Sequence, residues 1–251
     1  MFAEDEARLL LDHTDGRAAV PDELEALVAR RVAGEPLEHL LGWVELAGHR
    51  WSVGPGVFVP RRRSELLVRT ALHVTPPTEV VVDLCCGCGA VGGAVLLGLD
   101  GRSSAALHAS DLDPAAVAHA RRNLAPLGGT VHQGDLFDPL PAALRGRVDV
   151  LLCHAPYVPT AAIAGMPPEA RDHEPVVALD GGSDGLDVLR RVVADAPAWL
   201  RPGGSLLFEV GTDQTGGALA LVAAAALRGR VVHAEDDDGP GGTVVVAAAG
   251  T

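Results

Sequence analysis

Three turns of the chain carry residue types that can hold a nucleoside. The first follows an apolar segment at 79–84 and opens a helical segment. Glycines in such a turn let backbone amides approach a ligand closely, and the start of the following helix favours negative charge. We predict that this turn contacts a ligand through six residues: Asp83, Cys85, Cys86, Gly87, Cys88 and Gly89.

The second and third turns add two carboxylates. Asp111 and Leu112 follow an apolar segment at 106–111, and a carboxylate placed there can accept both hydroxyl groups of a ribose. Gly134, Asp135 and Leu136 end a segment at 130–135 and can hold an adenine by its amino group and its faces. Each aspartate alone could instead cap a helix or form a turn. The three turns together favour a nucleoside pocket.

The elements that position these turns alternate between strand and helix. We expect strands at 79–84, 106–111, 130–135, 148–153 and 205–210, with helical segments after all but the third. This alternation predicts a parallel sheet covered on both faces, whose ligands bind beyond the carboxyl ends of the strands. Two further segments, 231–235 and 243–248, flank a hairpin-type turn at 236–242 and predict one antiparallel strand.

The chain before residue 79 has a different pattern. Apolar residues at helical spacing predict two short helices, at 4–13 and 21–33. Alternating apolar residues with glycines predict a β-hairpin between 43 and 59. We therefore divide the chain into a short helical region (1–42), a hairpin and linker (43–70) and a ligand-binding domain (71–251).

Composition narrows the function classes. The chain has 251 residues, of which 48% are hydrophobic, and a formal net charge of −13. This charge argues against an extended nucleic-acid footprint or an anionic membrane as partner. All 20 basic residues are arginine, which excludes a lysine-bearing phosphate loop and pyridoxal Schiff-base chemistry. An acidic N-terminus and the lack of a long apolar run predict a cytoplasmic protein.

The order of these motifs resembles the class I S-adenosylmethionine-dependent methyltransferases. More narrowly, the chain resembles the HemK/PrmC family of protein glutamine-N5 methyltransferases, which modify release factors. The resemblance runs from about residue 35 to the C-terminus and includes Phe58–Arg61, Glu174–Pro175 and Glu209–Gly211. It implies a Rossmann-like α/β fold with a seven-stranded, mainly parallel sheet, S-adenosylmethionine as cofactor, and Arg61 close to that cofactor.

A tetrapeptide after the fourth predicted strand carries the expected catalytic residues. The family has Asn-Pro-Pro-Tyr there, and this chain has His154, Ala155, Pro156 and Tyr157. In the family, the asparagine oxygen and the next carbonyl accept the two hydrogens of the substrate amide, and the tyrosine packs against the substrate. Ala155 keeps the carbonyl, and a neutral His154 can accept one hydrogen bond. We expect His154 to border both the substrate and the cofactor.

The histidine leaves two interpretations open. It can accept an amide hydrogen in place of asparagine, or it can act as general base for a small-molecule amine, ring nitrogen or hydroxyl. A third interpretation is a site that binds the cofactor without turnover. The partner is accordingly a protein with an exposed glutamine, such as a release factor, or a small-molecule acceptor.

The four cysteines, two arginines and two glutamates each have a functional and a structural interpretation. Cys85, Cys86, Cys88 and Cys153 could bind zinc, but we prefer small buried side chains around the cofactor loop, with no metal. We expect Arg62 and Arg63 to lie on a solvated surface. Glu174 lies in a loop long enough to be a lid. Glu209 either closes the pocket floor or caps the next helix.

Overall fold

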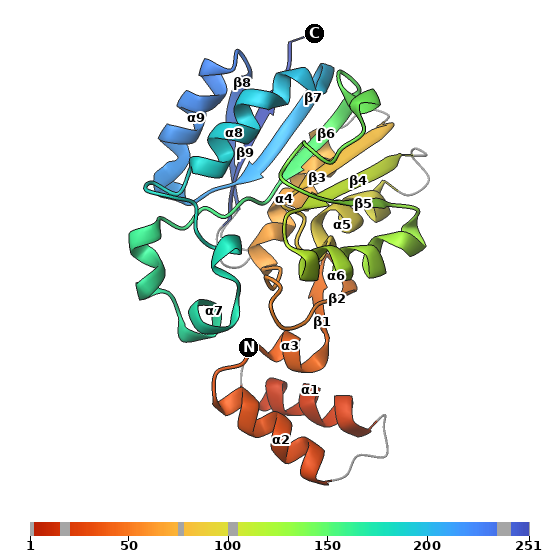
Figure 1. Cartoon of the computed structure of the whole chain (residues 1–251), viewed down its shortest axis with the longest axis vertical. Helices are drawn as coiled ribbons and strands as arrows, with labels where there is room; N and C mark the ends of the chain where they lie inside the picture. The colour runs from red at the N-terminus through yellow and green to blue at the C-terminus, as the bar shows by residue number, and fades with distance from the viewer. Residues whose placement is uncertain (1–2, 16–20, 75–77, 100–104, 235–241, 251) are drawn as a thin grey trace.

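The computed structural model describes residues 3–15, 21–74, 78–99, 105–234 and 242–250. Its centre is a seven-stranded sheet in the order β5-β4-β3-β6-β7-β9-β8 (Figure 1). β9 is antiparallel to both of its neighbours, and the pairs from β5 to β7 are parallel. The predicted fold class is confirmed. The strands are β3 Val80–Leu84, β4 Ala106–Asp111, β5 Thr130–Gln133, β6 Val148–Cys153, β7 Leu200–Glu209, β8 Arg228–His233 and β9 Thr243–Ala248.

Helices cover both faces of the sheet. One face packs against α4 (Glu65–Val74), α5 (Ala90–Gly98) and α6 (Pro114–Leu124). The other packs against α8 (Asp187–Asp195) and α9 (Thr215–Ala224). All five residues of β3 are buried, as expected for a central strand covered on two sides. Its side chains alternate between the two cores, so the carboxyl end of β3 is held from both faces.

Four strands differ from the sequence prediction. β3 begins one residue later than predicted, and β5 ends at Gln133 and not at 135. β7 begins at Leu200, five residues before the predicted start, because Leu200 pairs with Val148 ahead of an irregularity in the register. β8 covers Arg228–His233 and not 231–235. The predicted turn at 236–242 lies, apart from Gly242, outside the described residues.

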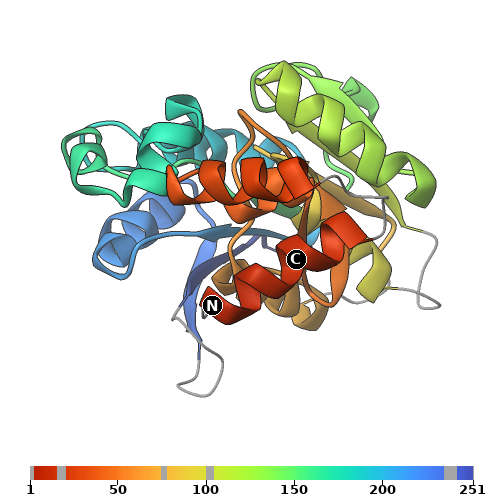
Figure 2. The same ribbon diagram turned by 90° about the horizontal axis from the view of Figure 1, so that it is seen from below.

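The N-terminal region forms three helices: α1 (Ala3–Asp15), α2 (Pro21–Val32) and α3 (Leu37–Leu41). Leucines from all three make a small core of their own. Figure 1 shows α1 and α2 below the main body, and Figure 2, seen from below, shows them in front of it. The boundaries at residues 42 and 70 remain a prediction. No helix among the described residues is both long and apolar enough to cross a membrane.

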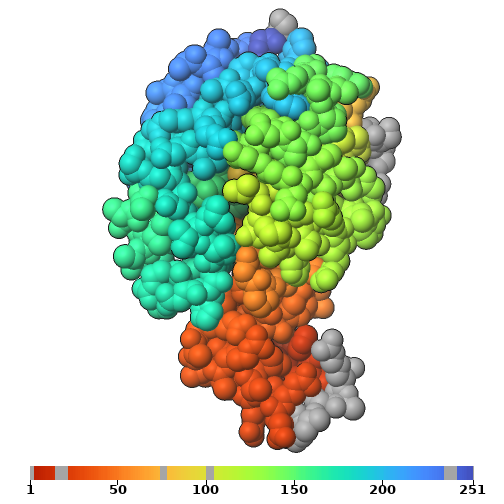
Figure 3. Space-filling view, viewed as in Figure 1, coloured from red at the N-terminus to blue at the C-terminus, as the bar shows by residue number. Residues whose placement is uncertain are grey.

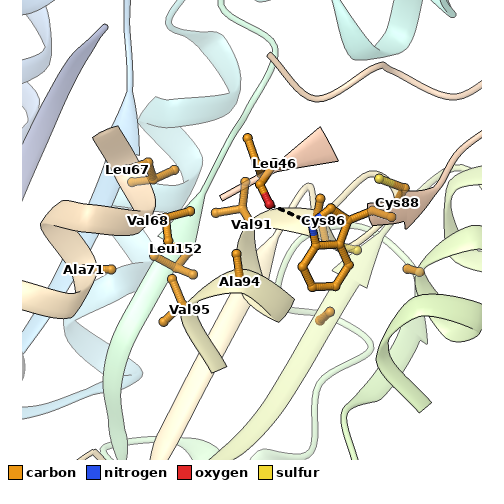
Figure 4. Packing of buried hydrophobic residues seen from close by; sticks show 14 of the residues in the cluster. Leu46, Leu67, Val68, Ala71, Cys86, Cys88, Val91, Ala94, Val95 and Leu152 are labelled. Atoms are coloured by element: carbon orange, nitrogen blue, oxygen red, sulfur yellow. Dashed lines mark hydrogen bonds between the residues drawn. The ribbon is translucent and has the colours of Figure 1, made fainter. Parts of the chain in front are cut away.

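The hairpin consists of β1 (Trp43–Leu46) and β2 (His49–Ser52) and joins the main core. It ends seven residues before the predicted limit at Val59. Leu46 and Trp51 are both buried, and the Trp51 indole donates a 3.1 Å hydrogen bond to the Leu46 carbonyl. Figure 4 shows this bond beside Val91 of α5. The hairpin therefore braces the helix that begins at the ligand-binding turn.

Gly93 of α5 lets the Trp51 ring approach the helix closely. A Cβ atom on Gly93 would lie 2.5 Å from two atoms of that ring. We predict that Gly93→Ala lowers the free energy of unfolding by about 1–2 kcal/mol, because overpacking outweighs the better helix propensity of alanine. Urea unfolding measures the change. Gly216→Ala in α9 is the matched control, since its Cβ would meet nothing within 4 Å. Equal stability of both variants would contradict the packing argument.

Candidate functional site

A cavity of about 440 Å³ lies at the carboxyl ends of β3, β4 and β6. Its volume is in the range of small-molecule sites. Figure 3 shows a hollow between the segments near 110–135 and near 160–190. Fourteen of the predicted site residues line the cavity: Arg61, Asp83, Cys85, Cys86, Gly87, Cys88, Asp111, Leu112, Asp135, Leu136, His154, Ala155, Pro156 and Tyr157. The sheet therefore brings the predicted turns together.

Two predicted contact residues do not line the cavity. Gly89 precedes α5 in a left-handed conformation, and a Cβ there would lie 2.9 Å from the Leu124 side chain of α6. Gly134 packs in the same way against Pro139. Direct ligand contact by these two glycines remains a prediction. They shape the backbone behind the cavity because a larger side chain has no room there.

The turn after β3 is held in an uncommon conformation. Cys85 has a φ of 53°, which lies in the left-handed region that residues other than glycine rarely adopt. Gly87 has a φ of 54°. The Gly87 amide donates a 2.8 Å hydrogen bond to Asp111 Oδ2 at the end of β4. Cys88 is fixed by a 2.8 Å bond from the Asn123 side chain of α6 to its carbonyl. Strain of this kind is retained where the surrounding structure enforces it.

Asp83 is the most unusual carboxylate of the cavity. Its side chain is fully buried, and Oδ2 accepts a 3.0 Å hydrogen bond from the Gly92 amide. Oδ1 has no partner. Burial raises the pKa of Asp83 to about 7. A buried carboxylate oxygen of this kind suits a ligand that donates from a cationic group.

The other two aspartates lie in different surroundings. Asp111 accepts bonds from the amides of Gly87 and Asp113, and burial raises its pKa. Asp135 forms a 2.6 Å ion pair with Arg191 of α8 at the exposed edge. Leu112, whose side chain is 56% exposed, and buried Leu136 are apolar cavity residues beside these aspartates. This combination of acids and apolar surfaces suits the two ends of a nucleoside.

His154 lines the cavity and lies next to an aromatic residue, Phe58, and a charged residue, Glu209. Its ring meets Phe58 edge-to-face at 5.4 Å between centroids, and Nε2 lies 3.7 Å from Glu209 Oε2. Burial lowers the pKa of His154, an effect that the negative Glu209 opposes and that Arg63 and Arg61 reinforce. The imidazole is therefore neutral at pH 7 and can accept a hydrogen bond.

Arg63 is only partly on a solvated surface, contrary to the prediction, because 38% of its side chain is exposed and its guanidinium is paired within the site. Its Nε donates a 2.8 Å hydrogen bond to Glu209 Oε1, and its Nη2 donates to the Tyr157 hydroxyl. The short helix Arg62–Ser64 turns Arg63 inward and leaves Arg62 exposed, as predicted for Arg62. Arg63 and Phe58 line the cavity although neither was predicted as a site residue. Their partners lie about a hundred residues away in the chain.

Glu209 lies next to two cavity residues, His154 and Tyr157, but does not itself line the cavity, so its role as the pocket floor remains a prediction. The carboxylate accepts bonds from Arg63, Ser64 and Tyr157 at 2.8, 2.8 and 3.1 Å. Burial raises its pKa, but the charges of His154 and Arg63 and the Ser64 hydrogen bond outweigh this and hold the pKa below its ordinary value. Glu209 is therefore an ion.

The loop from 158 to 186 forms one wall of the cavity. It contains short helices, among them α7 (Pro168–His173), and Met166, Pro167 and Val177 line the cavity. Glu174 is buried and accepts bonds from Arg61 Nη2 at 2.6 Å and from the Val59 amide at 3.2 Å. These bonds tie the loop to the segment before α4. Opening of the loop as a lid remains a prediction.

The four cysteines lie at the ends of β3 and β6. Cys85, Cys86, Cys88 and Cys153 are free thiols. The described part of the chain holds no group of three or more metal-binding side chains. Burial raises the pKa of Cys88 to about 12. A protonated thiol is a poor metal ligand, which is consistent with the prediction that these residues are small apolar side chains around the turn.

Comparison with known proteins identifies the family. Residues 53–164 match the model of the methyltransferase small domain. A release factor glutamine methyltransferase of Bordetella pertussis is 38% identical, with 92% of this chain and 90% of the relative covered. The chain belongs to the release factor glutamine methyltransferase family. It is a methyltransferase enzyme.

Two further matches qualify this assignment. A 4-amino-L-phenylalanine/4-methylamino-L-phenylalanine methyltransferase of Streptomyces pristinaespiralis is 36% identical, with 86% of this chain and 73% of the relative covered. A crystal structure of a methyltransferase from Pyrococcus furiosus has a TM-score of 0.59 at 15% identity, with 89% and 98% covered. The structural match shows the fold, and the sequence matches show that close relatives bear more than one substrate name.

The buried Asp83 gives a prediction about stability and pH. Its pKa in the folded chain is raised above the ordinary value of 3.8, so the folded state binds the proton more tightly. Its contribution to the free energy of unfolding is therefore present at pH 4 and is lost as the pH rises toward 7. We predict that Asp83→Asn is more stable than the parent without ligand at pH 8, by a few kcal/mol at most.

Urea unfolding at pH 5 and pH 8 measures this difference. The advantage of Asp83→Asn should grow between the two values, because asparagine does not ionise. Asp149→Asn is a control for a carboxylate that is buried but paired with Arg201 and with two amides. An advantage of Asp83→Asn that does not change with pH would refute the proposed cause.

Proposed function

We propose that this methyltransferase transfers the methyl group of S-adenosylmethionine to the side-chain amide nitrogen of a glutamine in a protein, of the release factor type. One observation carries the proposal. The tetrapeptide His154–Tyr157 borders the same cavity as the three nucleoside-type turns, in a chain whose relatives include a release factor glutamine methyltransferase.

The residues of the cavity fit the proposed cofactor. Asp83 Oδ1 has no partner and can accept from the ammonium of the methionine part. Asp111 can accept from the ribose hydroxyls, and Asp135 and Leu136 can hold the adenine. Arg61 and the turn 85–88 border the remaining space. When bound, the cofactor supplies a methyl group on a positively charged sulfur, a good leaving group.

The tetrapeptide supplies the acceptor geometry. A neutral His154 can accept one hydrogen of the amide, and the carbonyl of Ala155 can accept the other. Tyr157 is held by Glu209 and Arg63 and lines the same cavity. Holding the nitrogen in line with the methyl group is the main help that an enzyme can give to such a transfer.

The rim of the cavity supports a large acceptor. Val177 and Leu112 line the cavity and are 51% and 56% exposed, and Val176, next to Val177, is 57% exposed. Exposed apolar side chains around a cavity mark contact surfaces. We infer that a protein carrying the glutamine covers this rim. The net charge of −13 argues against nucleic acid as the acceptor.

A second candidate acceptor is a small aromatic amine. The relative from Streptomyces pristinaespiralis is named for 4-amino-L-phenylalanine, and this chain has an imidazole where an amine needs a proton acceptor. Phe58, Met166 and Val177 give the cavity apolar walls for such a ring. The two candidates differ in the size and the basicity of the nitrogen that receives the methyl group.

Labelled methyl transfer distinguishes the acceptors. The purified chain is incubated with S-adenosylmethionine carrying a labelled methyl group and with a bacterial release factor, or with 4-amino-L-phenylalanine. We expect label on a glutamine of the release factor, located by mass spectrometry. Label on the aromatic amine alone would overturn the proposed acceptor. Calorimetry with S-adenosylhomocysteine tests binding separately from turnover.

We predict a pH dependence that belongs to His154. Because protonated imidazole cannot accept a hydrogen bond, kcat should fall about tenfold per pH unit below the His154 pKa, which lies below 6.5. His154→Asn keeps a hydrogen-bond acceptor, so it should still methylate glutamine, with a lower kcat that shows no such decline. The pH profiles of kcat for both proteins measure this. A decline that persists in His154→Asn would assign the titration to another group.

A further inference from the structure

The charged residues behind His154 form one connected group. Glu209 ends β7 and has only 1% of its side chain exposed. Both of its oxygens are occupied, Oε1 by Arg63 and Tyr157 and Oε2 by Ser64. This leaves one face of Oε2 toward His154, at 3.7 Å from Nε2. These hydrogen bonds to both oxygens fix the carboxylate in place.

The position of Glu209 distinguishes the two nitrogens of the imidazole. A carboxylate attracts the nitrogen that carries a proton, and hydrogen bonds at catalytic sites tighten when the ligand binds. The neutral form of His154 then carries its proton on Nε2. Its Nδ1 keeps a lone pair that can accept a hydrogen bond or a proton.

We propose that Glu209 is a positioning residue that keeps the proton of His154 on Nε2, so that Nδ1 takes the proton released from the methylated nitrogen. This inference rests on the proposed methyl transfer to nitrogen. It applies to a glutamine amide and to an amine alike, since both nitrogens carry a surplus proton once the methyl group is attached.

The step balances in atoms and charge. The nitrogen lone pair forms the bond to the methyl carbon while the carbon–sulfur bond breaks and its electron pair stays on sulfur. The nitrogen is then positive, and one of its protons moves to Nδ1 of His154. The resulting imidazolium lies beside the negative Glu209, which stabilises it, and the proton leaves to water afterwards.

The other groups around His154 set when it takes the proton. Arg63 and Arg61 are positive and oppose protonation, as does burial, whereas Glu209 favours it. Tyr157 stays uncharged, because burial raises its pKa above its ordinary value. Arg63 contacts Glu209 and not His154, so it offsets much of the carboxylate charge in the resting site. His154 therefore remains an acceptor until positive charge arrives on the nitrogen.

The test replaces Glu209 by glutamine, which keeps the shape of the side chain and removes its charge. Nitrogen-15 NMR of histidine-labelled protein reports the tautomer and the titration of His154, with His154→Asn used to assign its signal. We expect the parent to carry the proton on Nε2. In Glu209→Gln the tautomers should mix, and the His154 titration should move to lower pH. Asp149→Asn removes another arginine-paired carboxylate, at the opposite end of β6, and should change neither.

Kinetics form the second arm of the test. Glu209→Gln should lower kcat about tenfold or more, leave the KM for the cofactor unchanged, and move the acid limb of kcat to lower pH with the His154 titration. A fall in kcat with the tautomer and titration of His154 unchanged would overturn the positioning role. The NMR experiment needs no turnover, so it tests the positioning role of Glu209 even where no methyl acceptor is found. A failure of the positioning role can therefore be distinguished from a failure of the proposed methyl transfer.

Discussion

The hydrogen bond from the Gly87 amide to Asp111 is the contact on which the site depends. It joins the turn after β3 to the end of β4 and holds the left-handed conformations of Cys85 and Gly87 in place. Parallel neighbouring strands end at the same edge of the sheet, so a carboxylate on one can bind the backbone of the other. The same aspartate thereby builds the turn and offers its remaining lone pairs to a ligand.

The buried carboxylates of the site differ in how many hydrogen-bond and ion-pair partners offset the cost of burying their charge. Glu209 has an arginine, a serine and a tyrosine as partners, whereas Asp83 has one backbone amide. A buried charge that is left partly unpaired costs free energy of folding, and a ligand that completes the pairing recovers it. Asp83 therefore marks a binding position, whereas Glu209 marks a fixed part of the framework.

The sequence predicted the fold and the cavity turns well, because short-range patterns encode them. Apolar runs such as 79–84 and 148–153 became β3 and β6, and both lie at the cavity with their following turns. The inward position of Arg63 could not be predicted, since its partner Glu209 is 146 residues away and three consecutive arginines are typical of a solvated surface. The close packing of Gly89 likewise depends on Leu124, which belongs to another helix.

The replacement of asparagine by His154 is chemically consistent with its surroundings. A histidine in this place works as an acceptor only while it is neutral, and burial favours the neutral form. An unpaired Glu209 beside it would favour protonation and abolish the acceptor. Arg63 prevents this, because it pairs with Glu209 and brings the charge near the imidazole close to balance. Under the proposed function, Arg63 and His154 therefore depend on each other, because the charge of Arg63 beside Glu209 favours the neutral imidazole that can accept a hydrogen bond.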